Sequence, residues 1–335
     1  WIAAVGDIQM GEDVPVDPTR GPLSRAAPWL SGADLALGNL EGPLTTAEPA
    51  KCARASRFCF AFRTPPHAAQ HLARVGFGAL SLANNHALDA GEPGRAETLR
   101  ALEAVGIRAA GGPEPTTILV PARPDGAATR RVAVLGFATA SHSPDLRDPR
   151  HVEMLVRDAA AAHDLVIVFF HGGAEGPDAM RVPRGRETYL GEDRGDLRAF
   201  ARRVVDAGAD LVLGSGPHVL RGLEIYRDRL VAYSLANFAG GGKLSTRGVR
   251  AHTGVLQVCL DAATGRFLSG RWAPFRLDDA GIPHPDPGGA AVETLRTLSL
   301  LDFWDSVPLI ESDGALGPSG GSADSARCGA PPGGL

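Results

Sequence analysis

Residues 79–91 read ALSLANNHALDAG, in which a short apolar strand pattern runs directly into Asn84, Asn85 and His86, with Asp89 three residues further on. Amides and imidazoles are poor strand formers, and burying them is costly unless each polar atom finds a partner. Three consecutive hydrogen-bonding side chains at a strand end exceed what a turn requires. We therefore interpret this stretch as a strand end that carries functional side chains.

The same pattern recurs at four other predicted strand ends. Strands are predicted at residues 2–5, 34–37, 165–170 and 210–213, and the polar side chains that follow them are Asp7, Asn39, Glu41, His171, Ser215 and His218. In open α/β sheets, ligands bind outside the carboxyl ends of the strands. The five strand ends are therefore predicted to converge on one crevice.

The order of predicted elements indicates the fold class. Helical patterns at residues 66–75, 96–105, 151–162 and 196–207 alternate with the strands, and such alternation is typical of α/β layering with mostly parallel strands. After Pro217 the pattern changes to hairpins, 223–226 with 230–234 and 255–260 with 267–272, followed by a short helix at 290–301. The Gly/Pro/Ser-rich segment 313–335 is predicted to be a disordered tail to a single domain, 1–312.

Composition excludes several classes of protein. The 335 residues are 44% hydrophobic, which is enough for a substantial core. The net charge of −4, with both signs interspersed, argues against a nucleic-acid surface. The apolar run 165–170 is far too short to span a bilayer. Scattered basic residues that could hold an anionic polymer are each expected to be solvated surface charges: Arg63, Arg181, Arg184, Arg186 and Arg221.

Cysteine spacing bears on the cellular compartment. Cys52 and Cys59 are separated by six residues, which matches neither a zinc knuckle nor a redox CxxC motif. We expect a local disulfide, which would imply an oxidising, extracytoplasmic compartment, with two unrelated thiols as the alternative. Cys259 lies in a strand pattern and is predicted to be a small core residue.

The side chains at the strand ends offer a consistent set of metal ligands. Asp7 and Glu41 provide carboxylate oxygens, Asn85 an amide oxygen, and His171 and His218 imidazole nitrogens. Such mixed donors suit one or two manganese, zinc, iron or magnesium ions. Taken singly, Asp7 could be a turn or cap residue and His171 a hydrogen-bonded core histidine, but five coincidences favour a metal site.

A second group of residues is predicted to assist this site. His86 is our candidate for an unligated imidazole that donates a proton to a leaving group, and Asp89 could orient it through a hydrogen bond. Asn84 could hold the turn. Glu175, in HGGAEG, is the next acidic group within reach, although it could equally be an exposed loop residue.

Six motifs together resemble one known family. GDIQMG (6–11), GNLEGP (38–43), SLANNHALDAG (81–91), FHGGAEG (170–176), GSGPHVLRG (214–222) and YSLANF (233–238) occur in the order expected of the CapA family of poly-γ-glutamate (capsule) synthesis proteins. That family's fold belongs to the calcineurin-like metallophosphoesterases. The resemblance, which runs from about residue 2 to 302, implies a four-layer α/β/β/α sandwich with a metal site at the strand ends.

The resemblance also implies roles for individual residues. It makes Asp7, Glu41, Asn85, His171 and His218 the metal ligands, with Asn39 beside Glu41, and His86 the catalytic histidine. Asn237 falls in YSLANF without an implied chemical role. The motifs depart from related phosphoesterases at two places. Those proteins carry a histidine at the position of Gln9, and many of them carry a further histidine at Ser215 or Gly216. The alternatives to a catalytic two-metal site are therefore a site with a single ion and a site that binds its ligand without catalysing a reaction.

Two functions follow as expectations. The first is a metal-dependent hydrolase or transferase of envelope polymers, acting on a phosphoester or a γ-glutamyl amide. The alternative is a non-catalytic component that binds or guides an anionic polymer; an unrelated α/β domain is a third reading. The resemblance implies an exported or membrane-anchored envelope protein, with a polymer or small-molecule substrate, capsule-synthesis membrane proteins as possible partners, and no nucleic acid.

Overall fold

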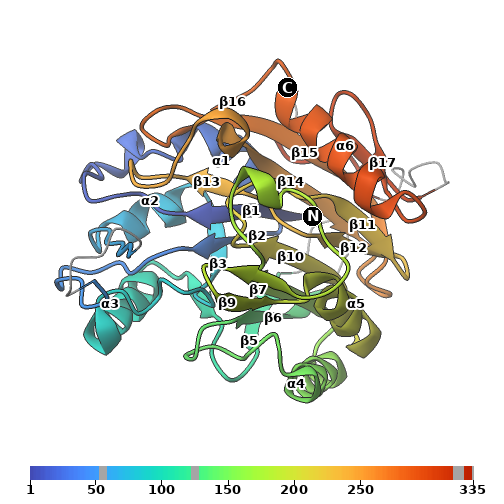
Figure 1. The fold of residues 1–335 in the computed structure, drawn as a ribbon, viewed down its shortest axis with the longest axis horizontal. Coiled ribbons are helices and arrows are strands. Elements are labelled where there is room, and N and C mark those ends of the chain that lie inside the picture. Colours follow the sequence, from blue (N-terminus) through green and yellow to red (C-terminus); the bar gives the residue numbers. More distant parts are fainter. Residues whose placement is uncertain (53–58, 122–127, 320–327, 334–335) are drawn as a thin grey trace.

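The computed structural model describes residues 1–52, 59–121, 128–319 and 328–333. Two large sheets lie face to face, and most helices lie on their outer surfaces (Figure 1).

The first sheet combines the N-terminal parallel strands with C-terminal antiparallel ones. Strands β1 (Ile2–Ile8), β2 (Leu35–Leu40), β3 (Phe77–Ser81) and β4 (Arg108–Ala110) are parallel neighbours. On the other side of β1 the order continues through β14 (His252–Leu260), β15 (Phe267–Leu277), β18 (Ala315–Gly317) and β17 (Leu309–Ile310), all in antiparallel pairs. Strand β13 (Asn237–Ala239) pairs in parallel with β1, and β16 (Pro283–Pro285) pairs with β15.

The second sheet has four parallel strands with an antiparallel strand at each edge. Its order is β11 (Leu223–Tyr226), β12 (Arg229–Ala232), β10 (Leu211–Ser215), β7 (Leu165–His171), β6 (Arg130–Ala138) and β5 (Thr116–Val120). The edge strands β11 and β5 are the antiparallel ones. A separate small hairpin is formed by β8 (Glu187–Tyr189) and β9 (Glu192–Gly195).

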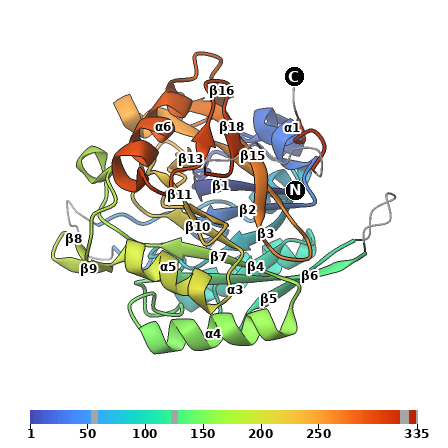
Figure 2. The same cartoon turned by 90° about the vertical axis from the view of Figure 1, so that its right-hand side faces the viewer.

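Three hydrophobic cores define four layers. Alternate residues of β1 and β7, such as Ile2 and Ile167, meet in a core between the sheets. The opposite face of β1, including Ala3, packs against α1 (Ala27–Leu30), α2 (Ala68–Arg74) and α3 (Gly91–Ala104). The opposite face of β7, including Val168, packs against α4 (Pro149–Ala162) and α5 (Leu197–Ala207), which lie side by side in Figure 2. The predicted α/β/β/α sandwich is confirmed.

The predicted elements are present with modest changes at their ends. The helix expected at residues 290–301 is α6 (Ala290–Phe303), and both predicted hairpins, β11–β12 and β14–β15, form. Helices α4 and α5 begin where Asp148 and Asp196 accept backbone hydrogen bonds as N-caps. Gly208 ends α5 in a left-handed conformation.

One prediction about the C-terminal segment was wrong for the residues that the structure describes. Ala315–Gly317 forms β18 instead of part of a disordered tail. Cys259 is a buried residue of strand β14, as predicted, and it also forms a disulfide with Cys328 that the spacing did not indicate. Nearby, Nε2 of Gln257 donates a hydrogen bond of 2.7 Å to the carbonyl of Pro332. A covalent link and short strand pairing order this segment although its composition does not.

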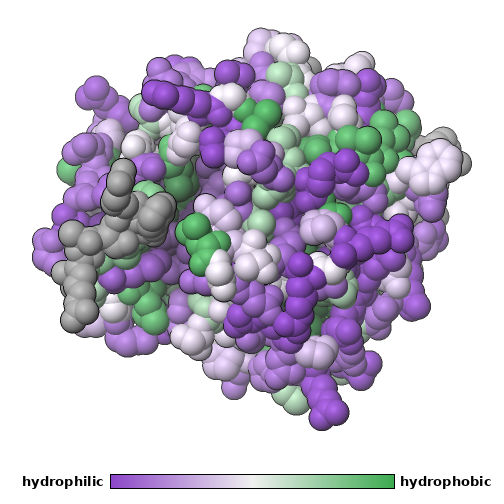
Figure 3. Space-filling view, in the orientation of Figure 1, coloured by the Kyte–Doolittle hydropathy of each residue, from purple (hydrophilic) through white to green (hydrophobic). Residues whose placement is uncertain are grey.

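One apolar patch is exposed over the end of α6 and β17, where green side chains gather in Figure 3. Leu300, Leu301 and Trp304 at the end of α6, and Leu309 in β17, are large exposed hydrophobic residues. Within the described ranges, no helix has the length and apolar character that a membrane crossing requires.

Candidate metal centre

A change of register in β1 places Asp7 at the meeting point of the two sheets. Ala3 and Val5 face the helix-side core, and so does Ile8, because the pairing with β2 shifts between Ala4 and Asp7. Such bulges often redirect a side chain beside an active site. Gly6 permits a close approach of Ala236, whose carbonyl would collide with any Cβ atom at this position and accepts a hydrogen bond from the Asp7 backbone.

Four predicted ligands come together from both sheets. Asp7 lies in β1 and Glu41 follows β2, whereas His171 ends β7 and His218 follows β10. Asp7, Glu41 and His218 each offer a ligand atom within 4.8 Å of the others. His218 adopts a positive φ of 57°, which is uncommon for a non-glycine residue and typical of functional sites.

Each of the two imidazoles lies between two carboxylates. Oε1 of Glu41 is 3.7 Å from Nε2 of His171 and 3.6 Å from Nε2 of His218. Asp7 lies on the other side of both rings, 3.7 Å from Nδ1 of His171 and 3.3 Å from Nδ1 of His218. Three buried atoms of the cluster have no hydrogen-bond partner among the described residues: both carboxylate oxygens of Glu41 and Nε2 of His171.

The protonation preferences indicate a shortage of positive charge. Burial and the neighbouring Asp7 raise the pKa of Glu41 well above its usual value. Burial would lower the pKa of His218, but Glu41 and Asp7 raise it to about 10. Burial opposes ionisation of Asp7, yet His218 and His171 hold its pKa below the usual value. Burial lowers the pKa of His171 to about 3. Two buried carboxylates beside neutral His171 form a donor set that fits a divalent cation.

Hydrogen bonds fix how the two imidazoles present their nitrogens. The Ser215 hydroxyl donates to the carbonyl of Phe170 at 3.2 Å, so its oxygen is left to accept from Nδ1–H of His171 at 3.1 Å. The lone pair of Nε2 then faces Glu41. Nδ1 of His218 lies 2.8 Å from Oδ1 of Asn237, which can accept only from a protonated Nδ1. Asn237 thereby has a structural role that its motif did not reveal.

A chain of amides supports Asp7. Nδ2 of Asn39 donates to Asp7 at 2.8 Å, and Nδ2 of Asn84 donates to Oδ1 of Asn39 at 3.0 Å. Oδ1 of Asn84 accepts from the backbone N–H of His86 at 3.0 Å. Asn84 therefore connects the strand end at residue 84 to Asp7, in addition to holding its turn.

His86 and Asp89 form the pair that the spacing predicts. Nδ1 of His86 lies 2.6 Å from Oδ2 of Asp89, and Nε2 lies 4.0 Å from Oε1 of Glu41. Burial lowers the pKa of His86, against the opposing effect of Asp89. Both side chains are buried at the edge of the cluster.

In the described part of the chain, no contact joins the Asn85 side chain to the four ligands that come together. Its side-chain oxygen is buried and has no partner in the described part of the chain, while its backbone carbonyl accepts from Nζ of Lys51 at 2.8 Å. Its role as a ligand stays a prediction.

Glu175 lies at the rim of the cluster, 3.8 Å from Nε2 of His218, and pairs with Nη1 of the buried Arg194 at 3.1 Å. Gln9 is also buried, with neither amide atom partnered among the described residues, and a Cβ atom at Gly241 would collide with its Oε1. Gln9 therefore packs against the Gly241 backbone.

The expectation that Arg221 is a surface charge was wrong. Its side chain is completely buried and donates to Glu187 through Nη1 at 2.9 Å and Nη2 at 2.7 Å. Two further hydrogen bonds reach the carbonyls of Ala174 and Ala179. Arg221 thus anchors the loop that follows His171, because an arginine in the interior requires partners for all its donors.

Three contributors were missed from the sequence: Lys51, Phe62 and Arg194. Nζ of Lys51 lies 3.0 Å from Oδ1 of Asp89, and the Phe62 ring stacks on His86 with centroids 4.1 Å apart. The only sequence signal for Lys51 and Phe62 is their closeness to Cys52 and Cys59. No local pattern marks Arg194, since its partner Glu175 lies on another loop.

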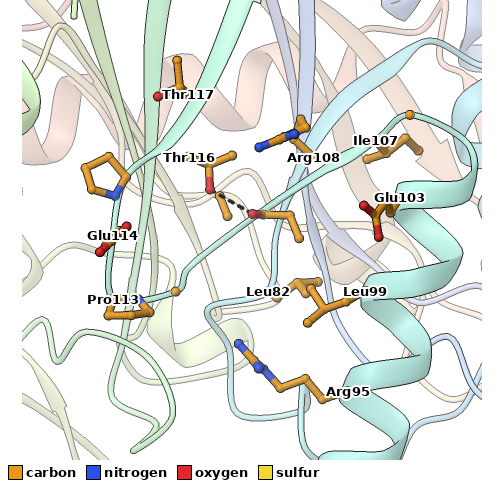
Figure 4. A pocket seen from close by; sticks show the side chains of 15 residues that line it. Leu82, Arg95, Leu99, Glu103, Ile107, Arg108, Pro113, Glu114, Thr116 and Thr117 are labelled. Atoms are coloured by element: carbon orange, nitrogen blue, oxygen red, sulfur yellow. Dashed lines mark hydrogen bonds between the residues drawn. The ribbon is translucent and has the colours of Figure 1, made fainter. Parts of the chain in front are cut away.

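A separate groove of about 740 Å³ lies between α3 and the β4–β5 connection, and none of the metal-centre residues that the structure describes lines it. In Figure 4, Arg95 and Leu99 extend from α3 towards Leu82, opposite Pro113. The charged side chains that line the groove are Arg95, Arg108, Glu103 and Glu114, two of each sign. This balance of charges favours no particular ligand.

The structure is a four-layer sandwich of two sheets and outer helices, with carboxylates and histidines gathered at the carboxyl ends of strands from both sheets. The model of the family "Bacterial capsule synthesis protein PGA_cap" matches residues 1–241. The chain belongs to this family, which confirms the predicted CapA resemblance.

Individual relatives agree with this assignment. The chain is 29% identical to the capsule biosynthesis protein CapA of Bacillus anthracis over 255 residues, which cover 70% of this chain and 58% of that protein. It is 30% identical to a "probable polyglutamine synthesis accessory protein" of Mycobacterium tuberculosis over 300 residues, which cover 82% and 76%. The chain therefore spans about three fifths of the length of the Bacillus relative.

Among solved structures, a Staphylococcus aureus protein provisionally described as a 5′-nucleotidase matches 85% of this chain and 52% of its own, at 13% identity and a TM-score of 0.41. So low a similarity carries no argument about function.

Proposed function

We propose that this chain is a metal-dependent hydrolase of capsule or polyglutamate synthesis, acting on a phosphoester or a γ-glutamyl amide of an envelope polymer. One observation carries the proposal: the buried carboxylate of Glu41 has no hydrogen-bond partner among the described residues, yet lies within 4.0 Å of three imidazoles. An unpartnered buried carboxylate is costly, and a bound cation would compensate it.

Asp7, Glu41, His171 and His218 would hold the ion, with Asn39, Ser215 and Asn237 orienting their side chains. A divalent ion at this position supplies Lewis-acid polarisation of a phosphoryl or carbonyl oxygen and lowers the pKa of water. The hydrogen bonds to Ser215 and Asn237 leave Nε2 of both histidines facing Glu41, the orientation that ligation requires.

His86 would act on the leaving group. Hydrolysis places a hydroxyl group on the phosphoryl or acyl centre and a proton on the departing oxygen or nitrogen. Asp89 holds Nδ1 of His86, so Nε2 is the atom that presents this proton. The burial that lowers the pKa of His86 makes its protonated ring a stronger acid.

The substrate class and compartment rest on the relatives and on the cysteines. The matched relatives carry names in capsule biosynthesis and in polyglutamine synthesis, which supports an envelope polymer as substrate. That this polymer is anionic, and that capsule-synthesis membrane proteins are partners, are parts of the proposal. The disulfides Cys52–Cys59 and Cys259–Cys328 support an extracytoplasmic location, because disulfides persist in oxidising compartments.

A specific observation favours the second candidate, a non-catalytic component that binds the polymer. The resemblance implies that many related phosphoesterases carry a further histidine at Ser215 or Gly216, and the Ser215 hydroxyl of this chain is occupied by His171 and the carbonyl of Phe170. The site therefore has fewer ligand nitrogens for a second ion.

The two candidates are separated by metal analysis and by manganese-dependent hydrolysis of bis(p-nitrophenyl) phosphate and of γ-glutamyl-p-nitroanilide. The proposal expects bound metal and hydrolysis of one probe that is lost in Asp7→Ala and His86→Ala and retained in the control His151→Ala, on α4. Unchanged hydrolysis in Asp7→Ala and His86→Ala would refute the mechanism. Polymer binding that survives chelation, without hydrolysis of either probe, would favour the binding component.

A further inference from the structure

The segment that precedes Cys52 in the Cys52–Cys59 disulfide makes several contacts with Asp89. The backbone N–H groups of Ala50 and Lys51 both donate to the Asp89 carbonyl, at 2.7 and 3.1 Å. Nζ of Lys51 reaches Oδ1 of Asp89 at 3.0 Å and the carbonyl of Asn85 at 2.8 Å. Residues 50 and 51 therefore hold both the backbone and the carboxylate of Asp89.

The segment on the other side of the disulfide contacts both Asp89 and its partner His86. The backbone N–H of Phe62 donates to Oδ2 of Asp89 at 2.7 Å, the oxygen that also binds His86. The Phe62 ring stacks on the His86 imidazole, at 26° between planes. Gly42, with a φ of 120°, leaves room for Phe62, since a Cβ atom there would lie 2.8 Å from that of Phe62.

The disulfide connects these two segments next to their contacts. Cys52 directly follows Lys51 and Cys59 lies three residues before Phe62, and their Cα atoms are 5.8 Å apart. Thr64 is paired separately with the segment after Glu41, by backbone hydrogen bonds with Pro43 and Thr45. The disulfide thus ties the Lys51 segment to one that is already fixed beside the metal centre.

We propose that Lys51, Phe62 and the Cys52–Cys59 disulfide form a clasp that positions the His86 imidazole towards Glu41. The catalytic consequence rests on the proposed function, whereas the positioning does not. Lys51 occupies Oδ1 of Asp89 and leaves Oδ2 for His86, and Phe62 fixes the plane of the imidazole. They are positioning residues: neither contacts the carboxylates or imidazoles of the metal cluster in the described contacts.

The second disulfide provides a matched control. Cys259–Cys328 joins β14 to the C-terminal segment, away from the cluster, so Cys52→Ser/Cys59→Ser and Cys259→Ser/Cys328→Ser remove the same chemistry from different places. The test compares both double variants with the wild type. It measures hydrogen–deuterium exchange of peptides covering residues 84–91, manganese binding by calorimetry, and kcat and KM for bis(p-nitrophenyl) phosphate.

The clasp predicts faster exchange at residues 84–91 and a fall in kcat of at least about tenfold in Cys52→Ser/Cys59→Ser, because small displacements of a catalytic group strongly slow reactions. Manganese affinity and KM should change less than about twofold, since Asp7, Glu41, His171 and His218 lie on other segments. The control double variant should leave exchange at 84–91 and kcat unchanged.

Lys51→Met and Phe62→Leu test the clasp with both disulfides intact. Each should increase exchange at residues 84–91 and lower kcat, and Lys51→Arg should restore most of both. Wild-type-like exchange at 84–91 in Lys51→Met, Phe62→Leu and the Cys52→Ser/Cys59→Ser variant would overturn the clasp. If the metal-loaded wild type hydrolyses neither probe, the proposed function fails while the exchange data still decide the clasp.

Discussion

Nε2 of His218 lies 3.6 Å from Oε1 of Glu41, although Glu41 follows a strand of the first sheet and His218 a strand of the second. An ion held by both would join the two sheets directly. Whatever binds only the folded chain stabilises it, by about 2.7 kcal/mol when the free ligand is at 100 times its Kd. We therefore predict that manganese raises Tm by several degrees and that EDTA reverses the shift, as measured by calorimetry.

Glu41→Gln should abolish this shift. Burial and Asp7 raise the pKa of Glu41, so its charge opposes folding without metal, and the metal-free variant should be at least as stable as the metal-free wild type. Glu153→Gln, a carboxylate of α4 remote from the centre, should retain the manganese shift. An equal shift in Glu41→Gln would exclude Glu41 as a ligand.

Replacing the His86–Asp89 pair should affect turnover more than metal binding. General acid catalysis contributes about 10²–10⁴-fold, so His86→Ala should lower kcat by about 10²-fold or more. Asp89→Asn should lower it less, because the imidazole remains but loses its charged partner at 2.6 Å. Steady-state kinetics with bis(p-nitrophenyl) phosphate and calorimetric manganese titration check both expectations. A parallel loss of manganese affinity in His86→Ala would instead make His86 a ligand.

The alternation of strands and helices and the strand-end residues could be predicted because both follow from local periodicity, whereas the four-layer sandwich was implied by the family resemblance. Asp7, Glu41, His171 and His218 could each be placed at a strand end, and parallel strands bring such ends to one edge. The contacts of Lys51, Arg194 and Arg221 could not be predicted, since each depends on a partner on a distant loop. The disulfide of Cys259 could not be predicted for the same reason, because its partner Cys328 is 69 residues away, in a segment whose composition resembles a disordered tail.

The buried Arg221–Glu187 pair should be a large contributor to stability. Removing one partner of a buried pair leaves an uncompensated charge and costs about 3–5 kcal/mol. We expect Arg221→Met to lower the free energy of unfolding in urea by this amount. Arg221→Met/Glu187→Leu should lower it much less, because neither charge is then left alone. If the double variant is as unstable as Arg221→Met, the hydrogen bonds to Ala174 and Ala179 matter more than the charge pair.

Stability at high pH should depend on Tyr233, whose hydroxyl donates to Oε2 of Glu224 at 2.7 Å in the interior. Burial, reinforced by Glu224, raises the pKa of Tyr233 well above its ordinary value of 10.0. A folded-state pKa above the unfolded one gives a contribution that is fully present below about pH 10 and is lost as pH rises towards the folded pKa. The free energy of unfolding should therefore fall above about pH 10 in the wild type, and fall less in Tyr233→Phe.

Urea unfolding at pH 8, 10 and 11 measures this difference, and groups common to both proteins cancel in the comparison. Tyr226→Phe, which changes a half-buried tyrosine at the end of the neighbouring strand β11, should keep the wild-type decrease. A decrease of equal size in Tyr233→Phe would mean that other groups govern the alkaline limit of the fold. A smaller decrease in Tyr233→Phe would assign that limit to the buried hydrogen bond between Tyr233 and Glu224. The Tyr233 phenolate cannot form there without breaking this bond and leaving two negative charges in contact.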